Sequence, residues 1–190
     1  VDVNTLADGL PRNNFLKRSL TWNENNVLDG ARHITIAGHI VYITTPDALV
    51  VLDLNDPLSP KLLNRIKMND PRASALQFRY LLVTDKDGVK IFDATSPNNI
   101  KSSPVAVVPL NDARKVYIAR TYAYVAAGKE GLAIIDVKNP EKPFINQIFT
   151  ADGKINDAQD VIVGSTNASL FAYVADGRNG LQVIQLTAPD

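Results

Sequence analysis

Four segments of this 190-residue chain repeat one pattern, and the repetition constrains the fold more than any other feature. Each segment is a short apolar run that ends in Asp or Gln, followed four positions later by proline. The segments are YITTPDALVVLDLNDP from Tyr42, LVTDKDGVKIFDATSP from Leu82, YVAAGKEGLAIIDVKNP from Tyr124 and YVADGRNGLQVIQLTAP from Tyr173. Their prolines, Pro57, Pro97, Pro140 and Pro189, stand 40, 43 and 49 residues apart. A period of about 40–50 residues is typical of propeller blades or helical arrays.

The local pattern within each segment favours strands over helices. In the third repeat the apolar residues alternate or cluster in short β-rich runs, which predict strands at residues 115–119, 122–126, 132–137 and 144–149. Gly128 and Gly131 supply a turn between two of these strands, because glycine adopts positive φ without steric cost. Pro140 and Pro143 interrupt the ladder, because proline has no N–H to donate. Four antiparallel strands in one period describe a propeller blade.

The same reading applied to the whole chain predicts an all-β protein, a β-propeller of four-stranded antiparallel blades with about four blades in this chain. The blades are predicted at residues 27–68, 69–110, 111–150 and 151–190. The last of them lacks an outer strand, and residues 15–22 resemble the missing piece. This segment is either the closing strand of a four-bladed ring or the remnant of a larger propeller.

Composition excludes several functions. Lys and Arg number 20, and so do Asp and Glu, so the chain lacks the basic excess of a nucleic-acid-binding protein. No apolar run approaches the roughly 18–20 residues of a membrane span. The absence of cysteine excludes disulfides, thiolate metal sites and covalently attached haem. Because the first residue is Val1, we expect that an initiator or signal peptide has been removed, or that the chain is an excerpt.

The repeats GLAIIDVKNPEKP (131–143) and ALVVLDLNDPLSP (48–60) resemble the LVIVD repeat of prokaryotic surface proteins. GVKIFDATSP (88–97) and GLQVIQLTAP (180–189) are weaker copies, and Gln185 departs from the usual Asp. The resemblance implies a β-propeller in a secreted or cell-surface protein of bacteria or archaea. It implies no catalytic residues.

Asp53, Asp93 and Asp136 recur once per blade at a strand end, where we expect each carboxylate to accept N–H groups of the following turn. Gln185 offers a neutral amide oxygen at the same position. Asp85-Lys-Asp87-Gly88 resembles the start of a calcium loop but lacks its later ligands, so it is interpreted as a hairpin turn. The two histidines, His33 and His39, cannot form a three-ligand site alone. We therefore expect no metal and no cofactor.

A second recurrence lies just before each first strand, where one Asp precedes one Arg or Gln. The set consists of Asp29, Asp70, Asp112 and Asp157 with Arg32, Arg72, Arg114 and Gln159. Because the first strand of a blade is innermost, these residues are predicted to ring the propeller axis. They would form either a belt of salt bridges that stabilises the ring or a funnel of guanidinium groups that binds an anion or peptide.

The sequence therefore predicts a non-enzymatic interaction or scaffold module, extracellular or on the cell surface, whose partner is a protein or another extracellular component. One alternative is a hydrolase or lyase with its site at the axis, which would need a carboxylate pair or a Tyr or His base there. Another is a structural subunit of an extracellular multihaem cytochrome assembly. The oligomeric state and the ligand stay open at this point.

Overall fold

The protein is built from four antiparallel sheets, each made of strands that are consecutive in the chain. The structure, a computed structural model, describes residues 20–166 and 169–187. Blade 1 consists of β1 (His33–Ala37), β2 (Ile40–Thr44), β3 (Ala48–Asp53) and β4 (Lys61–Lys67), and blade 2 of β5 (Ala73–Gln77), β6 (Tyr80–Asp85), β7 (Gly88–Asp93) and β8 (Ala106–Pro109). Blade 3 consists of β9 (Lys115–Ala119), β10 (Tyr122–Ala126), β11 (Leu132–Asp136) and β12 (Phe144–Phe149), and blade 4 of β13 (Asp160–Ser165), β14 (Leu170–Ala175) and β15 (Leu181–Gln185).

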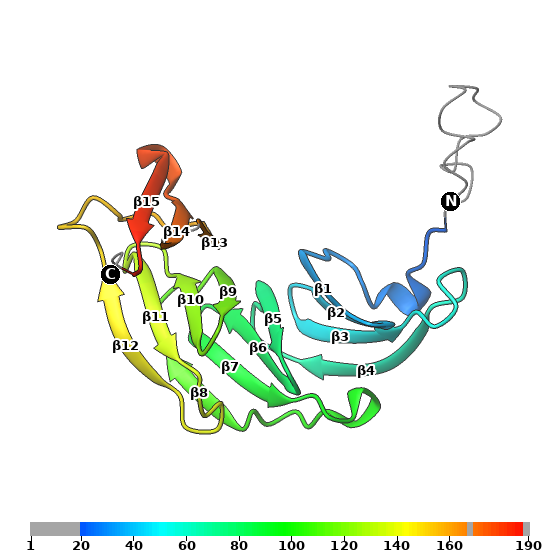
Figure 1. The fold of residues 1–190 in the computed structure, drawn as a ribbon. Coiled ribbons are helices and arrows are strands. Elements are labelled where there is room, and N and C mark those ends of the chain that lie inside the picture. The colour runs from blue at the N-terminus through cyan, green and yellow to red at the C-terminus, as the bar shows by residue number, and fades with distance from the viewer. Residues whose placement is uncertain (1–19, 167–168, 188–190) are drawn as a thin grey trace, which may run out of the picture.

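The sheets stack side by side in an arc, with the first strand of each blade on the inner side (Figure 1). These inner strands contact one another in order, β1 with β5, β5 with β9 and β9 with β13. This arrangement confirms the predicted β-propeller architecture. The arc is open between blade 4 and blade 1, so the described residues do not form a closed ring.

The predicted closing strand, residues 15–22, falls largely outside the described residues. Within the described part, the Trp22 side chain packs against the apolar cluster of blade 1 that contains Val41 and Val50. Blade 4 has three strands there, with β15 at its outer edge. The pairing of residues 15–22 with β15 therefore stays a prediction.

Burial follows from the alternation of side chains along each strand. Blade 2 covers one face of β3, and Trp22 and Leu28 cover the other, so its residues Ala48–Leu52 are apolar and at most 3% exposed. Three apolar cores fill the junctions between blades 1 and 2, 2 and 3, and 3 and 4. No helix in the described part of the chain is long and apolar enough to cross a membrane.

Candidate functional site

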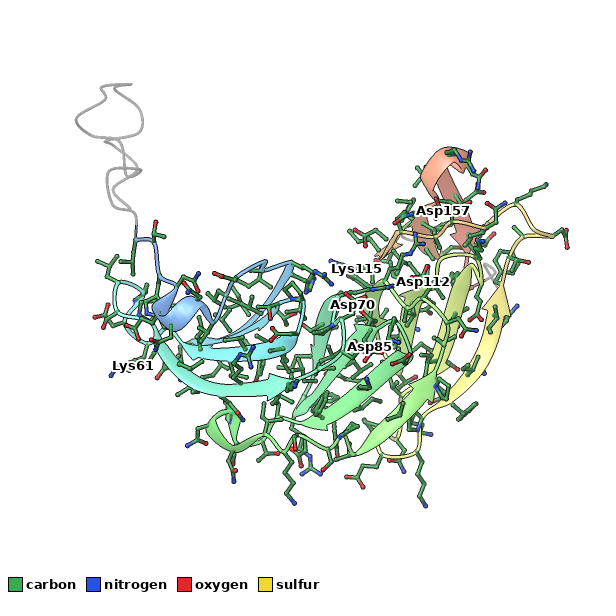
Figure 2. All side chains as sticks on the ribbon, turned by 180° about the vertical axis from the view of Figure 1, so that it is seen from behind. Lys61, Asp70, Asp85, Asp112, Lys115 and Asp157 are labelled. Carbon is green, nitrogen blue, oxygen red and sulfur yellow. The ribbon has the colours of Figure 1, made fainter. Side chains whose placement is uncertain are left out.

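The loops that lead into the inner strands carry a continuous series of ion pairs, which we call the axial belt. It consists of Arg32, Asp70, Arg72, Asp112, Arg114, Asp157 and Gln159. Figure 2 shows Asp70, Asp112 and Asp157 following one another along the inner side of the arc. The belt links all four blades.

The belt repeats one contact rule at each junction. Arg72 donates from Nε to Asp70 of its own blade at 3.1 Å and from Nη1 to Asp112 of the next blade. Arg114 repeats this, with Nε to Asp112 at 2.8 Å and Nη1 to Asp157 at 2.9 Å. Each guanidinium therefore bridges two neighbouring blades through its planar fork of donors.

The two ends of the belt are simpler. Among the described residues, the Arg32 guanidinium of blade 1 donates only to Asp70 of blade 2. In blade 4, the neutral Gln159 donates from Nε2 to Asp157 at 2.8 Å. The belt thus begins with one cation and ends with one amide, and its three Arg and three Asp residues balance in charge.

The backbone places these side chains by the same device in two blades. Asp70 and Asp112 have φ of 58° and 59°, in the left-handed region, which turns the chain sharply before the inner strand. Their N–H groups donate to carbonyls of the preceding blade, Asp70 to Pro46 at 3.2 Å and Asp112 to Lys86 at 3.1 Å. Each Asp is thereby held at the junction where it meets two Arg side chains.

Asp29 does not belong to the belt, contrary to the prediction that grouped it with the other three aspartates. Its carboxylate accepts a hydrogen bond from the Asn23 side chain at 2.6 Å. Gly30, two residues before Arg32 and with φ of 69°, occupies the position that Asp70 and Asp112 have in their blades. A Cβ at Gly30 would lie 2.8 Å from Pro46 Cγ, so blade 1 has no room for an aspartate there.

In blades 3 and 4 the turn after the second strand contains a glycine, Gly128 or Gly177, and the absence of a side chain there makes room for the belt. A Cβ at Gly128 would lie 2.3 Å from Asp112 Oδ2, and one at Gly177 would lie 2.1 Å from Asp157 Oδ2. Both glycines have positive φ. Spacing in the sequence gave no sign of this pairing, because the partners are 16 and 20 residues apart on different loops.

A buried carboxylate that follows the second strand of blade 4 supports the last belt member. Asp176 is 1% exposed, and its Oδ1 accepts the N–H groups of Asn156 and Asp157 at 3.2 and 2.7 Å. Its Oδ2 accepts a hydrogen bond from Asn179 Nδ2 at 2.8 Å. Asp176 therefore fixes the loop that carries Asp157.

Asp85 stands at the equivalent place in blade 2, after the second strand. Its carboxylate is fully buried and pairs with the Lys90 ammonium, while it also accepts the Asp87 N–H at 2.9 Å. The interpretation of this stretch as a hairpin turn agrees with the β6–β7 pairing of Asp85 with Gly88. The ion pair with Lys90 was not anticipated from the sequence.

The strand-end aspartates form the turns that their recurrence suggested. Asp53, Asp93 and Asp136 each accept the N–H two residues later, at 2.7, 2.9 and 2.8 Å. Gln185 differs, since its Nε2 donates to the Thr187 carbonyl at 2.9 Å. These four residues lie at strand ends and outside the axial belt.

The histidines do not meet. His33 accepts the Ser74 N–H at its Nδ1 at 3.1 Å, an interblade hydrogen bond, and burial together with the nearby Lys115 ammonium lowers its pKa. His39 is exposed in the β1–β2 turn. Among the described residues, no group of three or more His, Cys, Asp or Glu side chains could hold a metal ion.

The arginines of the belt lower the pKa values of two of its aspartates, Asp70 and Asp112. At Asp70 the hydrogen bond from Arg32 holds the pKa below its ordinary value, and Arg72 adds to this. At Asp112 burial alone would raise the pKa, but hydrogen bonds from Arg114 and Arg72 outweigh burial and lower it. Both side chains remain about one third exposed, so solvent screens these interactions.

These shifts predict that acid weakens the fold. Because the folded pKa of Asp70 and Asp112 lies below the unfolded value near 3.9, the belt stabilises fully above that pH and less as pH falls through the folded pKa values. We expect the urea midpoint to fall steadily from pH 5 to pH 3. Asp112→Asn should flatten this dependence, and an equally steep fall in that variant would show that other carboxylates cause it.

Four-stranded antiparallel sheets stacked about an axis define this chain as a β-propeller. A family model for the LVIVD repeat matches residues 30–67, 111–150 and 156–189, together more than half of the chain. The protein therefore belongs to the LVIVD repeat family. The matched stretches coincide with blades 1, 3 and 4. No curated protein matches the chain.

Solved propellers share the fold at low sequence identity. The computationally designed Ika4 protein has a TM-score of 0.63 at 13% identity, over 89% of this chain and 96% of Ika4. The designed Ika8 protein has a TM-score of 0.61 at 13% identity, over 82% of this chain and 46% of Ika8. BamB from Moraxella catarrhalis has a TM-score of 0.54 at 15% identity, over 80% of this chain and 42% of BamB. This chain thus spans less than half the length of Ika8 and BamB.

Proposed function

We propose that this LVIVD propeller is a non-enzymatic interaction and scaffold module that works outside the cell or at its surface. One observation carries the proposal: the polar side chains that converge on the axis bind one another. Arg72 and Arg114 each hold two carboxylates, and the belt is neutral as a whole. Such a belt joins blades into a rigid body, and loops on a rigid body are well suited to recognition.

An enzyme at the axis has less support. A hydrolase or lyase would need a carboxylate or a Tyr or His base that is free to take a proton from substrate. In the described part of the belt, each carboxylate accepts hydrogen bonds from at least one guanidinium. A role as a structural subunit of a redox assembly stays compatible with the fold, but no specific contact favours it.

The rim opposite the belt offers a surface for recognition. Phe78, at the β5–β6 turn, is 91% exposed, and Leu58 in the β3–β4 loop is 57% exposed. Aromatic side chains of this kind often contribute most of the energy of protein interfaces. Neighbouring Arg79 stacks on Tyr80, which donates a hydrogen bond to Glu141 of blade 3. A protein partner would thus contact the exposed Phe78 side chain, which lies beside the polar contacts of Arg79, Tyr80 and Glu141.

A substitution in the belt tests whether the belt stabilises the scaffold or binds a ligand. We expect Arg114→Ala to lower the melting temperature by roughly 5 °C, because about 2 kcal/mol of charged hydrogen bonding is lost at a partly exposed site. Phosphate, sulfate, citrate and an acidic peptide should leave the melting temperature of the native protein unchanged. The exposed Lys142→Ala removes the same charge and should have little effect.

Stabilisation by an anion would contradict the purely structural role of the belt. An anion that raises the melting temperature of the native protein, and no longer does so in a folded Arg114→Ala variant, would make the axis a binding site. Location is tested separately, by fractionating cells of the source organism with an antibody against the chain. Detection in the cytosol alone would contradict an extracellular role.

A further inference from the structure

Blade 4 presents to solvent the sheet face that every other blade buries. We call the face that a blade turns toward the following blade its front face. In blade 1 this face includes Leu49 and Val51, and both are fully buried against blade 2. The equivalent side chains of blade 4, Leu181 and Val183, are 65% and 57% exposed.

These positions correspond through the strand register. Val51 pairs with Tyr42 in blade 1, and Val183 pairs with Tyr173 in blade 4. Ile162, on the inner strand and also paired with Tyr173, is 56% exposed. Blade 4 therefore has the apolar front of an internal blade, and no other blade of the described residues covers it.

We call the face that a blade turns toward the preceding blade its back face. The back face of blade 1 also exposes apolar side chains. Ile34 and Ile36 on β1 are 55% and 63% exposed. Their counterparts on the inner strand of blade 4, Val161 and Val163, are 1% and 7% exposed because blade 3 covers them. The back face of blade 1 thus resembles an internal junction surface, and no other blade of the described residues covers it.

The linker into blade 1 is also built like an internal linker. Leu28 stands five residues before the inner strand, as do Met68, Leu110 and Ile155 in the other blades. Those three lie in the cores between blades, and Leu28 packs on the back of blade 1 with Trp22. Leu28 and Trp22 cover the middle strands of this face and leave β1 exposed.

Electrostatics permit these two faces to meet. At each internal junction an Arg of one blade reaches an Asp of the next. At the free ends the corresponding residues are Gln159 on blade 4 and Gly30 on blade 1, and both are neutral. Joining the ends would therefore bury no unpaired belt charge, which would be costly.

The two faces do not meet within one chain, because the three internal junctions set an arc that stays open between blade 4 and blade 1 (Figure 1). The fold matches 96% of the Ika4 chain, which is similar in length to this one, and 46% of the longer Ika8 chain. A second copy would supply a partner for both free faces and leave every existing junction unchanged.

We propose that two copies of this chain associate head to tail, with the front face of blade 4 in each copy docked on the back face of blade 1 in the other. The two junctions are identical and are related by a twofold axis, so the assembly closes. Each buries Ile162, Leu181 and Val183 of one copy against Ile34 and Ile36 of the other. This inference does not depend on the function of the belt.

The test starts with the mass in solution, by sedimentation or light scattering across the micromolar range. We expect twice the chain mass of 20.7 kDa. Val183→Glu and Ile36→Lys should each raise the dissociation constant about a hundredfold, because a charge is placed in an apolar junction. Val107→Glu, at an exposed position of the outer strand β8, is the matched control and should remain dimeric.

Mixing the two monomeric variants gives a sharper result. A head-to-tail pair of Val183→Glu with Ile36→Lys contains one native junction and one junction that combines Glu with Lys, so the mixture should recover dimers. An assembly in which like faces meet would not be restored. A monomeric native protein, or an open series of larger oligomers, would overturn the proposal and leave the function proposed for the belt unaffected.

Engineered cysteines identify the occupant directly, because the chain has no cysteine of its own. Ile36→Cys mixed with Val183→Cys should form an intermolecular disulfide under oxidation, whereas neither variant alone should. Crosslinking of Val183→Cys alone would show that two blade 4 faces meet. A disulfide within one chain of the double variant would show closure of a four-bladed ring. Either outcome would refute the head-to-tail dimer.

Discussion

Replacing Gly88 by alanine should lower the free energy of unfolding by about 4 kcal/mol. Gly88 begins β7 with φ of 141°, where side chains are strained, and pairs with Pro109 of the outer strand. An added Cβ would lie 2.1 Å from the Val108 carbonyl oxygen and 2.8 Å from the Leu110 nitrogen. Both atoms belong to the backbone, so the clash can be relieved only by moving β8.

Gly38→Ala is the matched control for this substitution. Gly38 also has a positive φ, 62°, but nothing lies within 4 Å of its added Cβ. The Gly38→Ala variant should lose only about 1 kcal/mol of unfolding free energy, which is the strain of an alanine in the left-handed conformation. Urea unfolding at a common m-value measures both changes. Equal losses in the two variants would contradict the steric argument.

Lys90→Met should be the second severe substitution, with a loss of about 3–4 kcal/mol at neutral pH. The Asp85 carboxylate is fully buried, and the Lys90 ammonium is its only cationic partner among the described residues. Methionine keeps most of the volume of lysine but leaves that charge without a counterion. The Asp87 N–H alone cannot compensate it.

A double-mutant cycle isolates this pair. Asp85→Asn keeps an acceptor oxygen for the Asp87 N–H and removes the charge, so adding it to Lys90→Met should restore about half of the lost stability. Denaturant titrations of the native protein, both single variants and the double variant provide the four free energies. Purely additive losses would show that the two side chains do not interact in solution.

The axial belt explains why Arg recurs at one repeat position in blades 1, 2 and 3. Two adjacent blades meet through apolar faces that fix distance but allow sliding. A guanidinium that donates to carboxylates of both blades adds a directional constraint at the axis. Arg72 and Arg114 provide it at the junctions on either side of blade 3. Blade 1 contributes Arg32 alone. Its belt position is Gly30, and Pro46 leaves no room there for the side chain of an aspartate.

Much of the fold could be predicted from the sequence, because the responsible signals are local. Short apolar runs rich in β-branched and aromatic residues predicted strands such as β2 and β10, and prolines marked where ladders end. The recurrence of Asp53, Asp93 and Asp136 predicted turns. The signal is local, because each carboxylate accepts the backbone N–H only two residues later. The period of the repeat identified blades before any contact was known.

Only the tertiary structure decided which of the recurring polar residues meet. In blade 1 the belt position is Gly30, where Pro46 leaves no room for a side chain, and the neighbouring Asp29 binds Asn23 instead. The buried Asp176 accepts N–H groups from Asn156 and Asp157, 20 and 19 residues away in the sequence, and no local pattern encodes these contacts. The open arc arises from small rotations summed over three junctions. Repetition in a sequence determines the unit, whereas packing between units determines how they close and what their ends expose.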